Sequence, residues 1–357
     1  MSTFRFFRGA FLFTGLCLLL GGWLGYQQAH TAAGAVNAVL ICLILGVMEV
    51  SLSFDNAVVN ATILRHMSLY WQRMFLTLGM LVAVFGMRLL FPLIIVALSA
   101  HIDPLAALHL ALSAPDRYAQ VLTGSHTAIM GFGGAFLMLV GLNFFLDQDR
   151  DVHWISFVEK PFAHLGQLPG APIGLTLIAV LLTARFLVPA GQALTFTDAA
   201  LYGILTWLGV EGIGALLGAE AGKAGAATAR SGLASFIYLE VLDASFSFDG
   251  VIGAFALSND LFIITLGLGI GAMFVRSLTV LLVEKGVLSN YRYLEHGAFW
   301  AILTLAFIMF LSVRLEVPEL VTGCLGGGLI LLAFLSSVFW NRAHPGAASM
   351  TLSEETS

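Results

Sequence analysis

The sequence consists largely of long apolar stretches that contain almost no charged residues. An α-helix needs about 20 apolar residues to cross the hydrocarbon core of a bilayer, where lipid offers no partner to an unpaired backbone group. Ten stretches reach or approach that length: 6–26, 36–63, 74–99, 127–147, 173–188, 198–218, 233–257, 261–284, 296–313 and 319–340. We therefore predict an all-α, polytopic membrane protein with about ten transmembrane helices, of which 173–188 is the shortest.

The composition excludes several classes of protein. Only 10% of the 357 residues are charged and 59% are hydrophobic, whereas soluble domains carry roughly 25% charged residues. This excludes a soluble enzyme and a disordered chain. With 16 basic and 21 acidic residues the chain has no basic patch for nucleic acid. Cys17, Cys42 and Cys324 lie in separate apolar stretches without metal-ligand spacing, so we expect them to be small packing residues.

The basic residues predict the topology, because they concentrate on the cytoplasmic side of membrane proteins. With ten spans and a cytoplasmic N-terminus, eleven of the 16 Lys and Arg residues fall on inner segments, and only Arg117 and Arg314 fall on outer ones. A missing span would invert every later loop and destroy this bias. We expect both termini, including a polar tail over 341–357, in the cytoplasm. Residues 1–30 are expected to form a transmembrane helix or signal anchor, with a cleaved signal peptide as the alternative.

Two segments of the chain resemble each other. Residues 49–55 read EVSLSFD and residues 243–249 read DASFSFD, which aligns Glu49 with Asp243. Further matches follow in the same order: Leu78-Gly79 with Leu266-Gly267, Arg88 with Arg276, and residues 134–136 with 297–299. The two motifs lie five spans apart, so the second copy enters the membrane from the opposite side. We predict an inverted 5+5 repeat with halves at 31–190 and 191–340 and a core of spans 2–4 and 7–9.

Five carboxylates lie in the two motif-bearing spans. Four are paired by the repeat, Glu49 with Asp243 and Asp55 with Asp249, and Glu240 is unmatched. A charged side chain at the centre of a bilayer costs about 2.5–3.5 kcal/mol on insertion scales, so such residues are functional candidates. The repeat places Glu49 and Asp243 at similar depth, near the membrane midplane.

Helical geometry groups most of these oxygen donors into two stripes. Ser53, Asn56 and Asn60 fall on the face of Glu49, and Glu240, Asp243 and Ser247 form a comparable stripe. Oxygen donors without cysteine or paired histidine suit Mg²⁺, Ca²⁺ or Mn²⁺. Asp55 and Asp249 lie off these stripes. Either a straight helix uses two faces, or the Ser-Phe-Asp turn is locally unwound.

Several charged groups have more than one interpretation. The clustered carboxylates need cations or protons to neutralise them, which permits proton-coupled exchange, or they hold helices together in a purely structural role. Arg88 and Arg276 either pair with the carboxylates, replace the ion when it is absent, or extend to the membrane interface. The histidines at span ends have no partner four residues away, so we expect interfacial positions for His126, His153 and His296.

Four segments carry a resemblance to a known family. They read EVSLSFDNAVVNA at 49–61, LEVLDASFSFDGVIGAF at 239–255, FFLDQDRDVHWI at 144–155 and YRYLEHGAFWAI at 291–302. The chain resembles the TerC-like integral membrane family, and within it the branch called domain of unknown function 475. The resemblance implies a bacterial inner-membrane protein related to LysE-type exporters, whose TerC-type members are associated with tellurium resistance and manganese export. It carries over these site positions: Glu49, Asp55, Asn56, Asp243 and Asp249.

The leading functional hypothesis is a divalent cation exporter, with Mn²⁺ favoured, whose site lies near the midplane between the inverted repeats. Its ligands would be Glu49, Asp55, Asn56, Asp243, Asp249 and Glu240, supported by Ser53, Ser247, Asn60, Arg88 and Arg276. The alternative is a membrane scaffold, or a subunit of a tellurium or stress-resistance complex, with structural acids. The expected partners are the lipid bilayer, the metal ion and, as a coupling ion, protons. We expect no cofactor and no enzyme, because no GxSxG or HExxH motif occurs.

Overall fold

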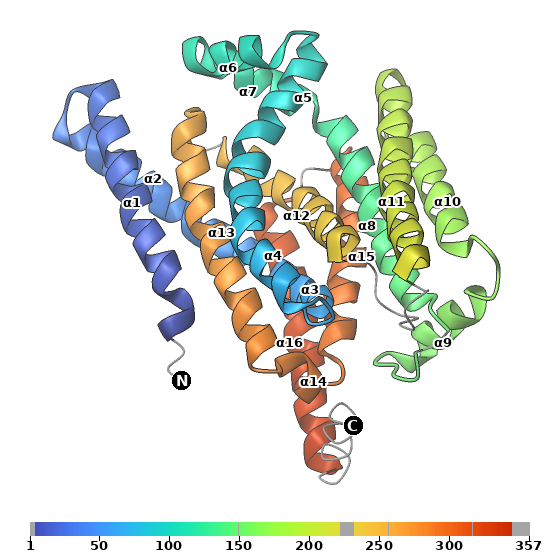
Figure 1. Ribbon diagram of the computed structural model, residues 1–357. Helices are drawn as coiled ribbons and strands as arrows, with labels where there is room; N and C mark the ends of the chain where they lie inside the picture. Colours follow the sequence, from blue (N-terminus) through green and yellow to red (C-terminus); the bar gives the residue numbers. More distant parts are fainter. Residues whose placement is uncertain (1–3, 149, 222–231, 256, 316, 345–357) are drawn as a thin grey trace. The chain divides into compact units, whose positions relative to one another are not determined.

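The computed structural model describes residues 4–148, 150–221, 232–255, 257–315 and 317–344. Every regular element in these ranges is a helix (Figure 1), which agrees with the predicted all-α class. Eight of the helical segments are long and apolar enough to cross a membrane. The chain is therefore a multi-pass membrane protein by the length and composition of its helices.

The chain divides into two compact units. The first comprises Met1–Phe54, Met67–Ile129 and Val210–Leu278, and the second comprises Asp55–His66, Met130–Gly209 and Thr279–Ser357. Each unit contains residues from both of the predicted halves, 31–190 and 191–340. The inverted symmetry itself stays a prediction.

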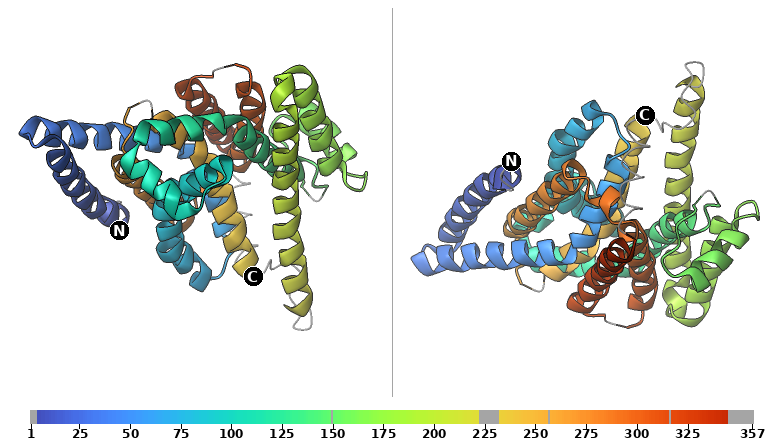
Figure 2. Two further views of the ribbon diagram at one scale, coloured as in Figure 1. Left: turned by 90° about the horizontal axis from the view of Figure 1, so that it is seen from above. Right: turned by 90° about the horizontal axis from the view of Figure 1, so that it is seen from below.

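The first unit begins with a hairpin of α1 (Phe4–Ala29) and α2 (Ala32–Leu52), seen in blue in Figures 1 and 2. The Thr31 side chain caps α2 by accepting a hydrogen bond from the backbone N–H of Gly34 at 3.1 Å. Gly25 and Gly34 let the two backbones meet, since a methyl group on either would overlap the other residue. Cys17 and Cys42 pack here with Ala38, confirming them as packing residues.

The rest of the first unit carries the arginines. The segment after Ser68 runs through α4 (Leu69–Leu81), the π-helix η1 (Val82–Leu90) and α5 (Phe91–Ala100), and leads to the short helices α6 (Pro104–Ser113) and α7 (Pro115–Gly124). Asp103 caps α6, where Pro104 occupies the first turn. The unit also contains α12 (Gly232–Ala254) and α13 (Leu261–Glu284) as far as Leu278.

The second unit is built around α15 (Leu294–Ser312) and α16 (Glu319–Ala343), which pack against each other. Figure 2 shows this pair in red and brown. The unit also contains these elements, of which α8 and α11 extend into the first unit: α3 (Phe54–Leu64), α8 (His126–Phe145), α9 (Ser156–Leu165), α10 (Ala171–Phe186), the 3-10 turn η2 (Ala190–Gln192), α11 (Ala193–Ala221) and α14 (Val287–Asn290). Cys324 is exposed on α16, so its predicted core position is wrong. The physical reason is that α16 buries little of its surface.

The predicted spans differ from the helices at three places. The second predicted span is not one helix, because α2 ends at Leu52 and α3 begins at Phe54. The fifth is α10, which has only 16 residues. The seventh is α12, which has 23 residues but includes three acids. The other seven predicted spans correspond to seven of the eight apolar helical segments, with bounds shifted by up to eight residues, and α2 supplies the eighth.

Candidate carboxylate–arginine site

The first buried ion pair joins α2 to the π-helix η1. Nη2 of Arg88 donates to Oε1 of Glu49, and both residues are only 2% exposed. The Ser53 hydroxyl donates to the same Oε1 at 3.0 Å. Glu49 is therefore held by a guanidinium and a hydroxyl, so Arg88 pairs with an acid and does not extend to the membrane interface.

The π-helical winding explains how Arg88 reaches this position. A π-helix pairs residues five apart, as between the Phe91 N–H and the Gly86 carbonyl. Nη1 of Arg88 donates to the carbonyl of Ala83, also five residues away. The Thr265 hydroxyl of α13 binds the Arg88 carbonyl at 3.3 Å. These contacts fix Arg88 between its own helix and Glu49.

The second buried ion pair joins α12 to α13. Nη2 of Arg276 lies 3.4 Å from Oε1 of Glu240. Nη1 of Arg276 donates to the carbonyl of Phe75, and the guanidinium carbon lies 4.1 Å from the centre of the Phe75 ring. Gly79 of α4 lies beside this contact. A methyl group on Gly79 would overlap Glu240 Oε1 and lie 2.7 Å from Arg276 Nη1.

The two pairs share one arrangement but not the same acid. Each arginine binds a backbone carbonyl with Nη1 and a buried glutamate with Nη2. The repeat matches Arg88 with Arg276 and Glu49 with Asp243, yet Arg276 pairs with Glu240, one turn before Asp243. Asp243 is buried at 8% exposure, and its Oδ2 has no hydrogen-bond partner among the described residues. The same holds for Oε2 of Glu240.

The break after Leu52 answers the question left open by the sequence. Ser53 ends α2 with φ −102° and ψ 18°, and its N–H still binds the Glu49 carbonyl at 2.9 Å. Asp55 lies in the first turn of α3, where Oδ1 accepts the Asn56 N–H at 2.9 Å. The helix of the first copy is therefore interrupted at Ser53 alone, with Phe54 and Asp55 already in α3, while α12 continues through the same turn of the second copy.

Three predicted oxygen donors lie in the second unit on α3. Asp55, Asn56 and Asn60 are all buried. The Oδ1 atoms of Asn56 and Asn60 have no hydrogen-bond partner within the described ranges. A methyl group on Gly326 of α16 would lie 3.1 Å from Oδ2 of Asp55, so the absence of a side chain there leaves space beside this carboxylate.

The structure brings together only some of the residues of the predicted six-ligand metal site. The structure brings Glu49 to Arg88 and Ser53, and Glu240 to Arg276, while Ser247 is buried on α12. The Asp249 side chain lies outside the described residues. Among the side chains that are described, no three His, Cys, Asp or Glu residues form a group that could hold a metal ion.

A separate polar cluster in the second unit, centred on Glu159, was not predicted from the sequence. Glu159 of α9 is 2% exposed and accepts hydrogen bonds from the backbone N–H groups of Trp154 (2.8 Å) and Ile155 (3.1 Å) and from Nε1 of Trp300 (2.9 Å). Nδ1 of His296 lies 3.1 Å from Oε2 of Glu159. His296 thus lies in the first turn of α15, where it is buried against an acid, and its interfacial position stays a prediction. The signal was present, because segments 144–155 and 291–302 carry part of the family resemblance.

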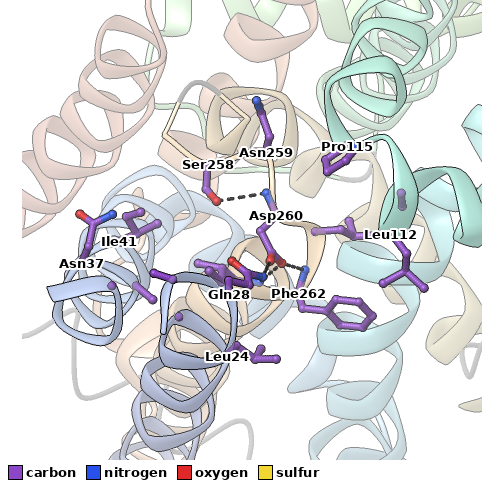
Figure 3. A pocket seen from close by; sticks show the side chains of 17 residues that line it. Leu24, Gln28, Asn37, Ile41, Leu112, Pro115, Ser258, Asn259, Asp260 and Phe262 are labelled. Carbon is purple, nitrogen blue, oxygen red and sulfur yellow. Dashed lines mark hydrogen bonds between the residues drawn. The ribbon is translucent and has the colours of Figure 1, made fainter. Parts of the chain in front are cut away.

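A pocket of about 660 Å³ lies at the ends of α1 and α2 (Figure 3). The Asp260 carboxylate in its lining accepts hydrogen bonds from the backbone N–H groups of Phe262 and Ile263 and from the side-chain amide of Gln28. Asp260 therefore serves as the cap of α13. None of the predicted site residues lines this pocket, so it is distinct from the carboxylate–arginine site.

Comparison with known proteins identifies one family. A family model described as "Protein of unknown function (DUF475)" matches residues 54–344, which is most of the chain. No curated protein and no solved structure match the chain.

Proposed function

Since the chain belongs to the DUF475 family, a family without an assigned function, we propose that it is a cation transporter of the bacterial inner membrane. Its substrate is a divalent cation, with Mn²⁺ favoured, and its direction is export. The proposal includes neither a cofactor nor an enzymatic activity. The resemblance to TerC-like proteins and LysE-type exporters supports the direction and the choice of metal. The oxygen-only set of donors supports a hard divalent cation.

The observation that carries the proposal is the set of buried, incompletely paired carboxylates in the candidate spans. Among the described side chains Arg276 pairs with Glu240 and not with Asp243, and each of these two acids retains an oxygen without a hydrogen bond. Burying an uncompensated charge in a membrane segment is costly, and such residues mark ion pathways. A cation that visits the site would supply the missing charge.

The ion pair between Arg88 and Glu49 sets a condition for ion binding at Glu49. Arg88 and Ser53 both bind Oε1 of Glu49, so this oxygen can coordinate an ion only after Arg88 leaves. In the proposed cycle, the guanidinium and the ion alternate at Glu49, and protons supply the coupling. The break at Ser53 and the π-helical turn at Arg88 are elements that can change locally while the rest of each helix stays intact.

The direct test is ion transport by the purified protein in proteoliposomes. We expect Mn²⁺ to cross the membrane with the wild-type protein, and Glu49→Gln and Asp243→Asn each to reduce the rate by tenfold or more. Glu284→Gln and Asp151→Asn are matched controls, because these acids are exposed. A wild-type protein that moves no divalent cation under any proton gradient would refute transport.

A scaffold role, as a subunit of a tellurium or stress-resistance complex, is the second candidate. The observation that favours it is that Glu49–Arg88 and Glu240–Arg276 each tie two helices together, which a purely structural protein also needs. It predicts that Glu49→Gln and Asp243→Asn change the thermal stability without changing any ion flux. Measuring both quantities on the same preparations separates the two functions.

A further inference from the structure

We propose that Glu240 is a positioning residue: it holds Arg276 away from Asp243, and thereby leaves Asp243 free to bind the cation. This inference rests on the proposed transport function. It assigns different roles to two acids that the sequence places in one ligand set.

The first copy has one acid for its arginine. Arg88 binds Glu49 directly, and the residue three positions before Glu49 is Gly46. This glycine corresponds to Glu240 in the second copy. A methyl group on Gly46 would lie 3.0 Å from Ile270 of α13, so the packing of α2 leaves no space for a second acid. Arg88 therefore neutralises the acid that matches Asp243.

The second copy has two acids for one arginine. Glu240 and Asp243 lie three residues apart on α12, so they face the same side and their charges interact. Both are more than nine-tenths buried. Only Glu240 is paired with Arg276, and Oδ2 of Asp243 has no hydrogen-bond partner in the part of the chain described here. The cluster thus contains one more acid than it has arginines, and Asp243 is the acid without an ion-pair partner.

The position of Arg276 explains this choice of partner. Its Nη1 is bound to the Phe75 carbonyl and its guanidinium lies over the Phe75 ring. Gly79 leaves room for Glu240 Oε1 beside that guanidinium. If Glu240 lost its charge, the nearest remaining acid on the same helix face would be Asp243. Arg276 would then pair with Asp243 and block it, as Arg88 blocks Glu49.

The first experiment measures Mn²⁺ binding to the purified full-length chain in lipid nanodiscs, with the electron paramagnetic resonance signal of free Mn²⁺ as the readout. We expect Glu240→Gln to weaken binding at least about tenfold, because Arg276 turns to Asp243. The double variant Glu240→Gln/Arg276→Gln should return to within about threefold of the wild type, since Asp243 is again without an ion-pair partner. If Glu240 is itself an ion ligand, the double variant stays as weak as the single one, which overturns the inference.

The second experiment needs no ion. Asp243→Asn is made in the wild-type and in the Glu240→Gln background, and the Tm of each protein is measured. We expect no loss of Tm in the wild-type background, where Asp243 is unpaired, and a loss of about 4 °C or more in the Glu240→Gln background, where it pairs with Arg276. Equal losses in both backgrounds contradict the inference. If the wild type binds no Mn²⁺, the proposed function fails, and the Tm comparison still decides which acid Arg276 selects.

Discussion

At the scale of residues, the chemistry of the first unit depends on two arginines that are buried with their acids. Arg88 and Glu49 together are nearly neutral, although each alone would be costly to bury. Removing one member of such a pair leaves an uncompensated charge, while removing both does not. The stability of this pair is therefore a property of the two residues together.

We predict that Arg88→Gln lowers the free energy of unfolding by about 3–5 kcal/mol, because Glu49 is left buried without its cation. The double variant Glu49→Gln/Arg88→Gln should lose clearly less. Thermal unfolding in nanodiscs measures both changes. Arg185→Gln is the control, because Arg185 lies in α10 but is exposed. A double variant as unstable as Arg88→Gln would show that the charge balance at this pair does not matter.

Glu159 gives a prediction about pH. Burial alone raises the pKa of Glu159, but the nearby His296 imidazole, whose Nδ1 lies 3.1 Å away, the hydrogen bond from Trp300 and the N–H of Ile155 outweigh it, so the pKa is lowered from 4.5 to about 2. A lowered pKa means that the ionised carboxylate stabilises the fold above pH 4.5 and that this contribution disappears as the pH falls toward 2.

We expect the wild type to lose stability between pH 4.5 and about 2 more steeply than Glu159→Gln, which should be less stable at neutral pH. Tm measured across this range for both proteins checks the prediction. The variant Glu284→Gln, at an exposed acid, should follow the wild-type curve. Parallel curves for wild type and Glu159→Gln would contradict the assigned role of this carboxylate.

At the scale of elements, glycines determine how closely helices approach the buried acids. Gly271 of α13 faces Glu49, and a methyl group there would overlap Cβ and Cγ of Glu49 and lie 2.8 Å from the Gly46 carbonyl. The Cβ and Cγ atoms of Glu49 and the backbone of α2 can move away only if α2 itself shifts. The α2–α13 contact therefore needs glycine at this position.

We predict that Gly271→Ala lowers the free energy of unfolding by about 1–3 kcal/mol through overpacking. It should also reduce Mn²⁺ transport, because Glu49 is displaced from Arg88. Gly209→Ala is the control, since a methyl group at Gly209 of α11 would meet nothing within 4 Å and alanine favours a helix. The prediction fails if Gly271→Ala is as stable as that control.

At the scale of the whole molecule, the number of membrane crossings connects the apolar helices to the charge of the loops. Eight helical segments are long and apolar enough, while the topology predicted from the basic residues has ten crossings. In that prediction the two additional crossings are α10, which is short, and α12, which contains the acids. Whether α10 crosses decides the orientation of everything after it.

We predict that α10 crosses the membrane from the cytoplasm to the outside. Single cysteines are introduced as Gln167→Cys and Gln192→Cys, in a background with Cys324→Ala to remove the exposed native thiol. A membrane-impermeant maleimide applied to intact cells should label the cysteine at 192 and not the one at 167. Labelling of both, or of neither, would show that α10 does not span.

The sequence alone determined the class of this protein and the identity of its charged groups. Hydropathy is additive along the chain, so seven predicted spans match apolar helices, and each acid or arginine in them is visible by its type. The tertiary structure decided the pairing of these groups, because pairing depends on local space: Gly79 leaves space for Arg276 and Glu240 to meet, and the packing of Gly46 against Ile270 leaves no room for a second acid near Glu49. The buried Glu159 cluster depended on tertiary contacts in the same way, since Trp300 and His296 of α15 meet Glu159 of α9. Such contacts join residues far apart in the chain, and no spacing along the sequence expresses them.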